Sequence, residues 1–164
     1  MIRKATTDDI PLIRAMAEVV FRRTYASILS PEQMEYMMDM MYSEESLISQ
    51  MTSEGNVFLI EEGKAYASYR YQGKSEDGRE VFHLEKLYVM PSAQKTGLGR
   101  ELFEAVLSEI RSVSPSNPVV ELNVNRSNPA VSFYEHMGMR KARQGDFPIG
   151  NGFFMNDFIM AIDA

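Results

Sequence analysis

The chain has 164 residues, 45% of them hydrophobic and 24% charged, which predicts one globular domain over residues 1–164 with a substantial core. A formal net charge of −6 argues against nucleic acid as a partner, and no apolar run approaches the ~18 residues of a membrane span. The absence of cysteine excludes disulfides and thiolate chemistry, and two separate histidines, His83 and His136, make a metal site unexpected.

The first third of the chain predicts one short strand and three helices. Its opening segment lacks the apolar core of a signal peptide, so we expect a cytoplasmic protein. Residues 2–5 favour a strand, and Thr6 resembles a helix cap before apolar residues at helical spacing up to Phe21. Ser30 and the proline after it begin a second helix, whose methionine stripe we interpret as core. A third helix follows up to Met51.

Three strands are predicted before the longest helix. Residues 57–61 and 65–71 are rich in strand-forming residues, and the Glu-Gly pair between them favours a tight hairpin turn. Residues 72–80 are polar and contain two glycines, which indicates an exposed loop. The third strand, residues 81–89, combines β-branched, aromatic and aliphatic side chains and ends just before a proline.

The rest of the chain continues the mixture of helices and strands. A long helix begins near Gly97 and carries apolar residues on one stripe as far as Val113. Three further strands and one short helix are expected, the strands over 119–124, 139–143 and 152–162 and the helix over 129–137. A loop over 145–151 separates the last two strands. The whole order predicts an α/β fold with one mixed sheet of roughly six to seven strands.

Val81 to Ile110 form a strand, a glycine-bearing loop and a helix in that order. Glycines before a helix allow backbone N–H groups to close around an anion, which the helix dipole also favours. The nucleotide P-loop is excluded because Gly99 is followed by Arg-Glu instead of Lys-Ser/Thr. The dinucleotide fingerprint is excluded because it needs three glycines where this loop has two. A different phosphate-binding element is therefore predicted.

The loop Gln94–Gly99 fits the pattern Gln/Arg-x-x-Gly-x-Gly/Ala, and the strand before it, Leu84–Pro91, fits Leu-x-x-Leu-Tyr-Val-x-Pro. Together they resemble the acyl-coenzyme A signature of the GNAT superfamily of N-acetyltransferases. The resemblance implies acetyl-CoA as cosubstrate, with pantetheine on the strand and pyrophosphate on the loop amides. The implied binding residues are Leu87, Tyr88, Val89, Gln94, Lys95, Thr96, Gly97, Leu98, Gly99, Arg100, Asn128 and Tyr134.

A second segment, Asn125–Met139, resembles the GNAT motif Asn-x-x-Ala-x-x-Phe-Tyr-Glu-x-x-Gly-Phe. It departs from that motif in two ways. Asn128 lies two residues before Ala130 where many members have three, and Met139 replaces the usual Phe, which is a swap of similar volume. Tyr134 on this helix has two interpretations, a core aromatic or the acid that protonates the departing thiolate. The first motif upstream favours the acid.

The resemblance also implies a fold and a mechanism. The fourth and fifth strands of a GNAT sheet splay apart, the cofactor enters the gap, and a neutral amine attacks the thioester. Because a free alkylamine has a pKa near ~10, a base must remove its proton. Strict alternation along the strand places His83, Glu85 and Leu87 on one face. We expect Glu85 as the base with His83 as the alternative, although strand ends also carry solvated residues of both types.

Both ends of the chain resemble bacterial diamine and polyamine (spermidine) acetyltransferases, from Phe21 to Met34 and from Phe147 to Met160. The resemblance implies a polyamine acceptor, which acidic residues after Ser30 would attract unless they are simply solvated. Two alternatives stay open. One is a protein or peptide N-terminal acetyltransferase, and the other is a non-catalytic acyl-CoA-binding domain. The apolar C-terminal strand, residues 153–162, is a candidate for pairing in a homodimer.

Overall fold

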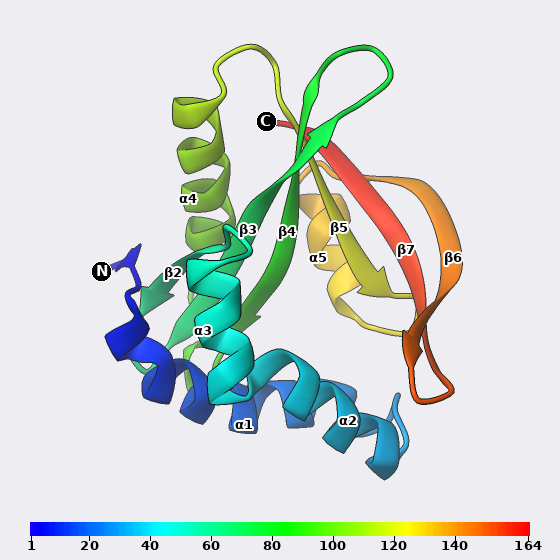
Figure 1. The fold of residues 1–164 in the computed structure, drawn as a ribbon. Coiled ribbons are helices and arrows are strands. Elements are labelled where there is room, and N and C mark those ends of the chain that lie inside the picture. Colours follow the sequence, from blue (N-terminus) through cyan, green and yellow to red (C-terminus); the bar gives the residue numbers. More distant parts are fainter.

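The computed structural model describes residues 1–164 and contains seven strands, five α-helices and two short 3-10 helices (Figure 1). The strands are β1 Arg3–Lys4, β2 Val57–Glu61, β3 Ala65–Lys74, β4 Glu80–Val89, β5 Val119–Asn125, β6 Arg140–Gly150 and β7 Phe153–Asp163. The helices are α1 Ile10–Tyr25, α2 Pro31–Tyr42, α3 Glu44–Thr52, α4 Leu98–Val113 and α5 Ala130–His136, with η1 Thr7–Asp9 and η2 Pro91–Ala93. None of these helices combines the length and apolarity needed to cross a membrane.

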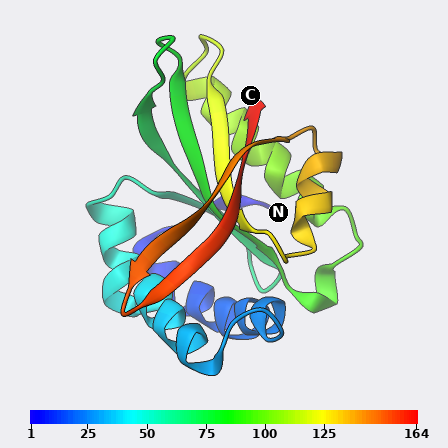
Figure 2. The same cartoon turned by 90° about the vertical axis from the view of Figure 1, so that its right-hand side faces the viewer.

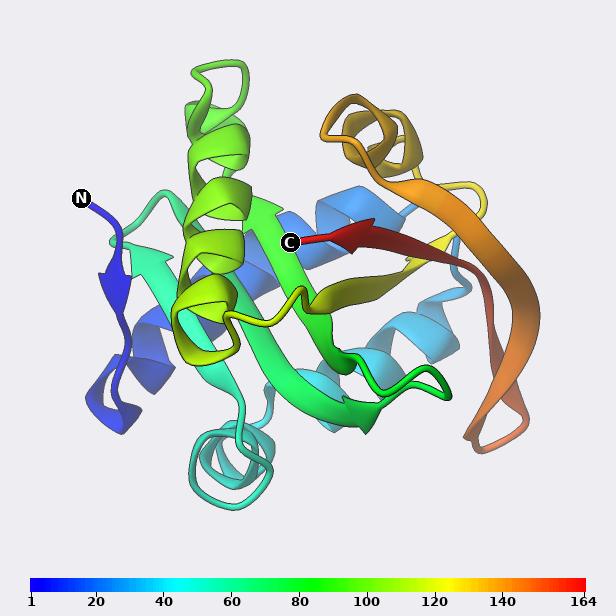
Figure 3. The ribbon, with the colours of Figure 1, turned by 90° about the horizontal axis from the view of Figure 1, so that it is seen from above.

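All seven strands form one sheet in the order β1-β2-β3-β4-β5-β7-β6. Every neighbouring pair is antiparallel except β4 and β5, which are parallel. Helices α4 and α5 cover one face of the sheet, and α1, α2 and α3 lie on the other (Figure 3). The predicted mixed α/β fold is confirmed.

Each layer of helices encloses its own hydrophobic core. The amphipathic helix α4 buries one stripe against the sheet, including the fully buried Leu102 and Val106. On the opposite face, Met34, Met37 and Met38 of α2 pack against α1 and the sheet. The methionine stripe is therefore core, as its spacing predicts.

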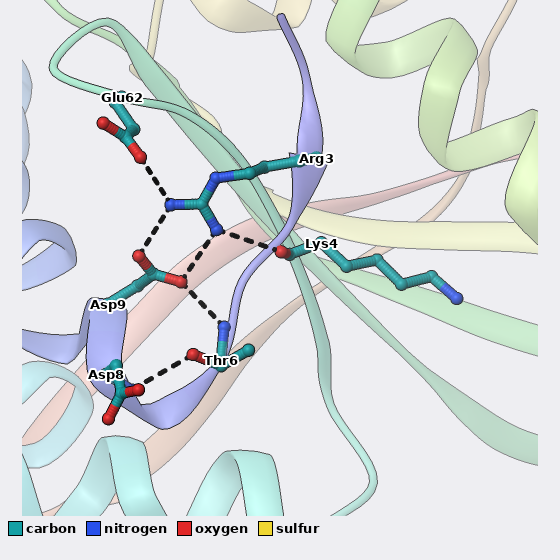
Figure 4. Close-up of polar contacts among 6 residues, drawn as sticks. All are labelled: Arg3, Lys4, Thr6, Asp8, Asp9 and Glu62. Atoms are coloured by element: carbon teal, nitrogen blue, oxygen red, sulfur yellow. Dashed lines mark hydrogen bonds and ion pairs between the residues drawn. The ribbon is translucent and has the colours of Figure 1, made fainter.

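The N-terminal strand is fastened to the turn between β2 and β3 by an arginine (Figure 4). Nη2 of Arg3 donates to Oδ1 of Asp9 at 2.8 Å and to Oε1 of Glu62 at 2.7 Å. Thr6 and Asp9 cap the start of the first helical turn reciprocally, as Thr6 predicts. These exposed contacts add little stability, but they fix the direction in which α1 leaves the sheet.

The parallel strands β4 and β5 pair over only three residues. Val81 to His83 align with Val119 to Glu121, and beyond them no ladder connects the two strands. Figure 1 shows the strands close together at this end and diverging toward their carboxyl ends. The divergence confirms the predicted splay and opens the centre of the sheet.

A β-bulge at Glu85 overturns the predicted alternation along β4. Ser68 of β3 is opposite Lys86, whereas the next residue, Tyr69, is opposite Leu84, so Glu85 is the extra residue. Leu84 and Leu87 consequently both pack on the α4 side, while Lys86 lies among α2 and α3. His83 and Glu85 remain neighbours, but the prediction that Leu87 shares their face is wrong.

The predicted loop over residues 145–151 is also wrong, because β6 continues to Gly150 and the turn is confined to residues 151–152. Pro148 and the glycines suggested a loop. However, β6 is the outer strand of the sheet, where a proline is tolerated because no ladder bond is lost on the open side. Phe147 pairs with Met155 across this hairpin. The apolar strand β7 lies between β5 and β6, so both of its edges are paired.

Candidate active site

A cavity of about 670 Å³ opens where β4 and β5 diverge. Its walls are formed by the carboxyl ends of both strands, the loop before α4, helix α5 and the end of α1. This volume is typical of small-molecule sites. Most of the predicted binding residues line it, namely Leu87, Tyr88, Val89, Gln94, Lys95, Gly97, Gly99, Arg100, Asn128 and Tyr134.

The loop before α4 presents backbone more than side chains. Gly97 has a φ of 89°, in the left-handed region, and precedes the first helical residue without a side-chain cap. Lys95 is also left-handed, with a φ of 64°. Two side chains of the loop bond to nearby backbone. Gln94 donates to the carbonyl of Val89 at the end of β4 at 3.1 Å, and Thr96 donates to the Ala93 carbonyl at 2.6 Å. The first N–H groups of α4 are therefore available to an anion.

Two predicted contact residues do not line the cavity. The side chain of Leu98 is buried in the core under α4, and Thr96 turns its hydroxyl back to the loop. Only their backbone groups can serve a ligand. Gly99 leaves little room for a side chain, because a Cβ there would lie 3.4 Å from the ring of Phe133, already in van der Waals contact.

The resemblance to the acyl-coenzyme A signature implies that replacing Gly97 with valine raises the KM for acetyl-CoA about tenfold, because a β-branched residue strains a left-handed backbone by roughly 1–2 kcal/mol per residue. Steady-state kinetics with varied acetyl-CoA measure this change. Gly63→Val is the matched control, because Gly63 is also left-handed at 71° and has no neighbours within 4 Å, but lies in the β2–β3 turn. An equal KM in both variants would contradict the role of the loop.

Helix α1 contributes a tyrosine that the sequence did not indicate. The hydroxyl of Tyr25 lies 3.2 Å from that of Tyr88 and accepts a hydrogen bond from Nδ2 of Asn128 at 3.3 Å. Oδ1 of Asn128 accepts from the Ala130 N–H at 2.9 Å, so this side chain also begins α5. No motif or spacing connects Tyr25 to residues more than 60 positions away.

Tyr134 is buried, but its hydroxyl borders the cavity. The ring packs against Phe133 and Phe103, with centroids 5.3 and 6.3 Å away. Unlike Tyr25, Tyr134 makes no hydrogen bond within the chain, and burial raises its pKa. The phenol is consequently neutral, held rigidly and free to donate a proton into the cavity.

The two candidate bases lie side by side. Nδ1 of His83 is 3.3 Å from Oε1 of Glu85, which also accepts a hydrogen bond from Nε of Arg70 at 2.5 Å. Burial would raise the pKa of Glu85, but His83 and Arg70 outweigh it and lower this pKa to about 2. Burial would lower the pKa of His83, whereas contact with Glu85 raises it, and the net shift is upward. A proton shared by the pair therefore rests on the imidazole.

Glu85 lines the cavity, and His83 lies behind it, away from the lining. His83 is held from its other side by Asn123, whose Oδ1 is 2.9 Å from Nε2. The two residues that the sequence left as alternatives thus form one unit. Its partners Arg70 and Asn123 were missed, because they lie on strands whose pairing the sequence does not reveal.

The acidic residues of α2 lie elsewhere. Glu35 and Asp39 line a separate cavity of about 370 Å³ between α1 and α2, and Glu35 is paired with Arg22 at 2.5 Å. They do not face the large cavity, so the predicted attraction of an amine by these residues is not supported. No group of three or more His, Asp or Glu side chains is arranged to hold a metal ion.

Residues 25–153 match the family model of the acetyltransferase (GNAT) domain. The chain belongs to the GNAT family. This GNAT protein is 26% identical, over 92% of its own length and 90% of the relative's, to an uncharacterized N-acetyltransferase in the pepI 3′ region of Lactobacillus delbrueckii subsp. lactis.

Solved structures share the fold along the whole GNAT chain. A PaiA N-acetyltransferase from Thermoplasma acidophilum in complex with coenzyme A matches with a TM-score of 0.74 and 19% identity, covering 100% of this chain and 98% of that one. The ribosomal-protein-S18-alanine N-acetyltransferase of Escherichia coli matches with a TM-score of 0.66 and 23% identity, covering 99% and 92%. The GNAT protein is accordingly an acetyl-CoA-dependent N-acetyltransferase, and the glycine loop and apolar strand ends fit that cosubstrate.

Proposed function

We propose that this enzyme acetylates a primary amine of a small molecule by direct attack of the amine on the acetyl thioester. The observation that carries the proposal is the pairing of a free phenol with a shared base around one cavity. Tyr134 contributes a hydroxyl without a partner, and the bulged Glu85 faces the same cavity with His83 behind it. Acetyl-CoA supplies the acyl group when bound.

The proton steps follow from these contacts. The amine proton passes to Glu85, directly or through water, and rests on Nδ1 of His83 because a carboxylate with a pKa of about 2 holds it poorly. As the C–N bond forms and the C–S bond breaks, Tyr134 gives its proton to the sulfur. Arg70 keeps Glu85 in place by its 2.5 Å hydrogen bond throughout.

We assign the cofactor contacts to the same walls. Backbone groups of Leu87 and Val89 face the gap between the strands and suit the amides of pantetheine. The amides from Gln94 to Arg100 suit the pyrophosphate, because they begin α4 and carry little side-chain bulk. Asn128 and Tyr134 then approach the sulfur end.

Among small amines, we propose a polyamine such as spermidine, supported by the resemblance of both chain ends to polyamine acetyltransferases. The β6–β7 hairpin belongs to one of these ends, and its tip folds back onto α2 (Figure 2). There Tyr36 donates to the Ile149 carbonyl at 2.6 Å and Gln33 to the Phe154 carbonyl at 2.8 Å.

Release of coenzyme A with spermidine, spermine, single amino acids and an alanine-terminated peptide tests the acceptor class. We expect the polyamines to give the highest kcat/KM. A peptide preference would instead favour the protein or peptide alternative, and the E. coli structure is named an alanine N-acetyltransferase of a ribosomal protein. Tight binding of acetyl-CoA without turnover of any amine would contradict catalysis and favour a binding domain.

We also propose a homodimer that pairs along β6 instead of β7. The eleven residues of β6 form the outer strand of the sheet, whose second edge is unpaired. Sedimentation analysis distinguishes the dimer from a monomer by a doubled mass.

A further inference from the structure

Asp157 is a carboxylate in the middle of the sheet that no step above uses. It lies on the interior strand β7 and is fully buried. Oδ2 accepts one hydrogen bond, from Nδ2 of Asn123 at 3.2 Å, and Oδ1 has no partner in the chain. The nearest guanidinium, that of Arg126, bonds to the Asp157 carbonyl and to the carboxylate of Asp146 instead. The Asn123 amide is thus the only hydrogen-bond donor in the chain to the Asp157 side chain.

Asn123 joins this carboxylate to the base. A carboxylate only accepts hydrogen bonds, so the amide must turn Nδ2 toward Asp157 and Oδ1 toward His83. An amide oxygen also only accepts, and Nε2 of His83 must therefore carry a proton. In the neutral ring, the lone pair then lies on Nδ1, so the Asn123 contact acts against the Glu85 carboxylate, which is 3.3 Å from Nδ1 and on its own would favour a proton there. Asp157 in this way selects the basic atom.

We propose that Asp157 is a positioning residue that, through Asn123, fixes the tautomer of His83 and leaves its Nδ1 as the proton acceptor. The inference rests on the proposed function of the His83–Glu85 pair. It is supported by a row of side chains that crosses β3, β4, β5 and β7. The row consists of Arg70, Glu85, His83, Asn123 and Asp157, and each lies within hydrogen-bond or ion-pair distance of the next. Asp157 itself touches neither the cavity nor Glu85.

The other charges around His83 do not replace this role. Arg70 on β3 is engaged by Glu85. Glu121, the Cα partner of His83 on β5, is held by both terminal nitrogens of Arg143 on β6, at 2.9 and 3.2 Å. Only the Asn123 amide reaches Nε2, so the orientation of that amide decides which ring nitrogen is protonated.

Asp157→Asn removes the constraint on the amide and is expected to lower kcat by about 10- to 100-fold, with an unchanged KM for acetyl-CoA. An amide at position 157 can donate as well as accept, so Asn123 is free to turn Nδ2 toward His83 and move the ring proton to Nδ1. The ¹⁵N ring signals report the tautomer directly. His83 and His136 are the only histidines, and His136 serves as the internal reference.

The exchanged pair Asn123→Asp/Asp157→Asn separates the effect of the amide's orientation from the effect of side-chain packing at the two positions. In this double variant, the amide at position 157 donates to the carboxylate at position 123, which in turn accepts from Nε2 of His83. The original tautomer and most of kcat should therefore return. A carboxylate beside the imidazole should also shift the pH profile of kcat to higher pH. Asp146→Asn is the matched control, because that exposed carboxylate bonds to Arg126 outside the row.

A His83 tautomer that is unchanged in Asp157→Asn would overturn the inference and leave the proposed function intact. A wild-type enzyme that turns over no amine would overturn the proposed function, while the tautomer signals would still test the inference. If Asp157→Asn fails to fold, the tautomer of His83 can be measured in the exchanged pair and in Asn123→Leu. A wild-type tautomer together with full kcat in Asn123→Leu would also overturn the inference.

Discussion

Replacing Tyr134 with phenylalanine is expected to lower kcat by about 100-fold or more, with little change in the KM for acetyl-CoA or in Tm. The hydroxyl makes no hydrogen bond in the chain, so the folded state loses no internal bond when it is removed. The ring contacts with Phe103 and Phe133 remain. What is lost is the acid that protonates the departing sulfur.

Tyr69→Phe is the matched control for this experiment. Tyr69 is also buried in the core beneath α4, and burial raises its pKa to about 12, but it does not line the cavity. Its phenylalanine variant should keep the wild-type kcat. If Tyr134→Phe does the same, another group protonates the sulfur, and the proposed acid is wrong.

His83→Gln is expected to lower kcat by about 100- to 1,000-fold near neutral pH, because the shared base loses the nitrogen on which the proton rests. The profile of kcat against pH, with saturating amine, provides a second readout. In the wild type, kcat should rise as pH increases through the elevated pKa of His83, since only the neutral ring accepts a proton.

Glu85→Gln is the companion variant, and its effect on pH has a definite sign. Glu85 raises the pKa of His83, so removing its charge should move the rising limb of kcat to lower pH. The maximal kcat should also fall, because no carboxylate then connects the cavity with the imidazole of His83. A limb that stays in place, or moves to higher pH, would show that the two residues do not act as a pair.

The sequence predicts well the wall of the cavity that β4 and the loop before α4 form, because local patterns define it. A strand, a glycine pair and a helix begin within one continuous stretch, Val81–Ile110, and each part can be interpreted from neighbouring residues. Gly97 and Gly99 lie where their spacing implies, and Tyr134 faces the cavity. The same local character allows the strand order in the chain to be predicted correctly up to Val124.

The arrangement of His83 and Glu85 could not be predicted in this way, because it depends on sheet pairing. Whether Leu87 shares a face with His83 is decided by the bulge at Glu85, which exists only relative to β3. Asn123 connects His83 to Asp157 because β5 lies between β4 and β7 in the sheet, although β7 is not the strand that follows β5 in the chain. Residues that are 40 and 34 positions apart thereby form one polar row.

The extent of β6 was predicted wrongly for another reason, because the position of a strand in the fold can outweigh its local sequence signals. Proline and glycine at 148 and 150 favour a loop, but at the open edge of the sheet they only shift the register with β7 by one residue, and the strand continues. The extended hairpin then reaches α2, where Gln33 and Tyr36 donate hydrogen bonds to its backbone. This contact between two distant parts of the chain is a feature that the local sequence patterns do not reveal.

We infer that acetyl-CoA enters between β4 and β5 with its sulfur at Tyr134. A crystal structure of the wild-type enzyme with coenzyme A tests it most directly. We expect the sulfur within about 3.5 Å of the Tyr134 hydroxyl and the pyrophosphate on the amides between Gln94 and Arg100. A pyrophosphate bound elsewhere, or a sulfur remote from both Tyr134 and Glu85, would contradict the account.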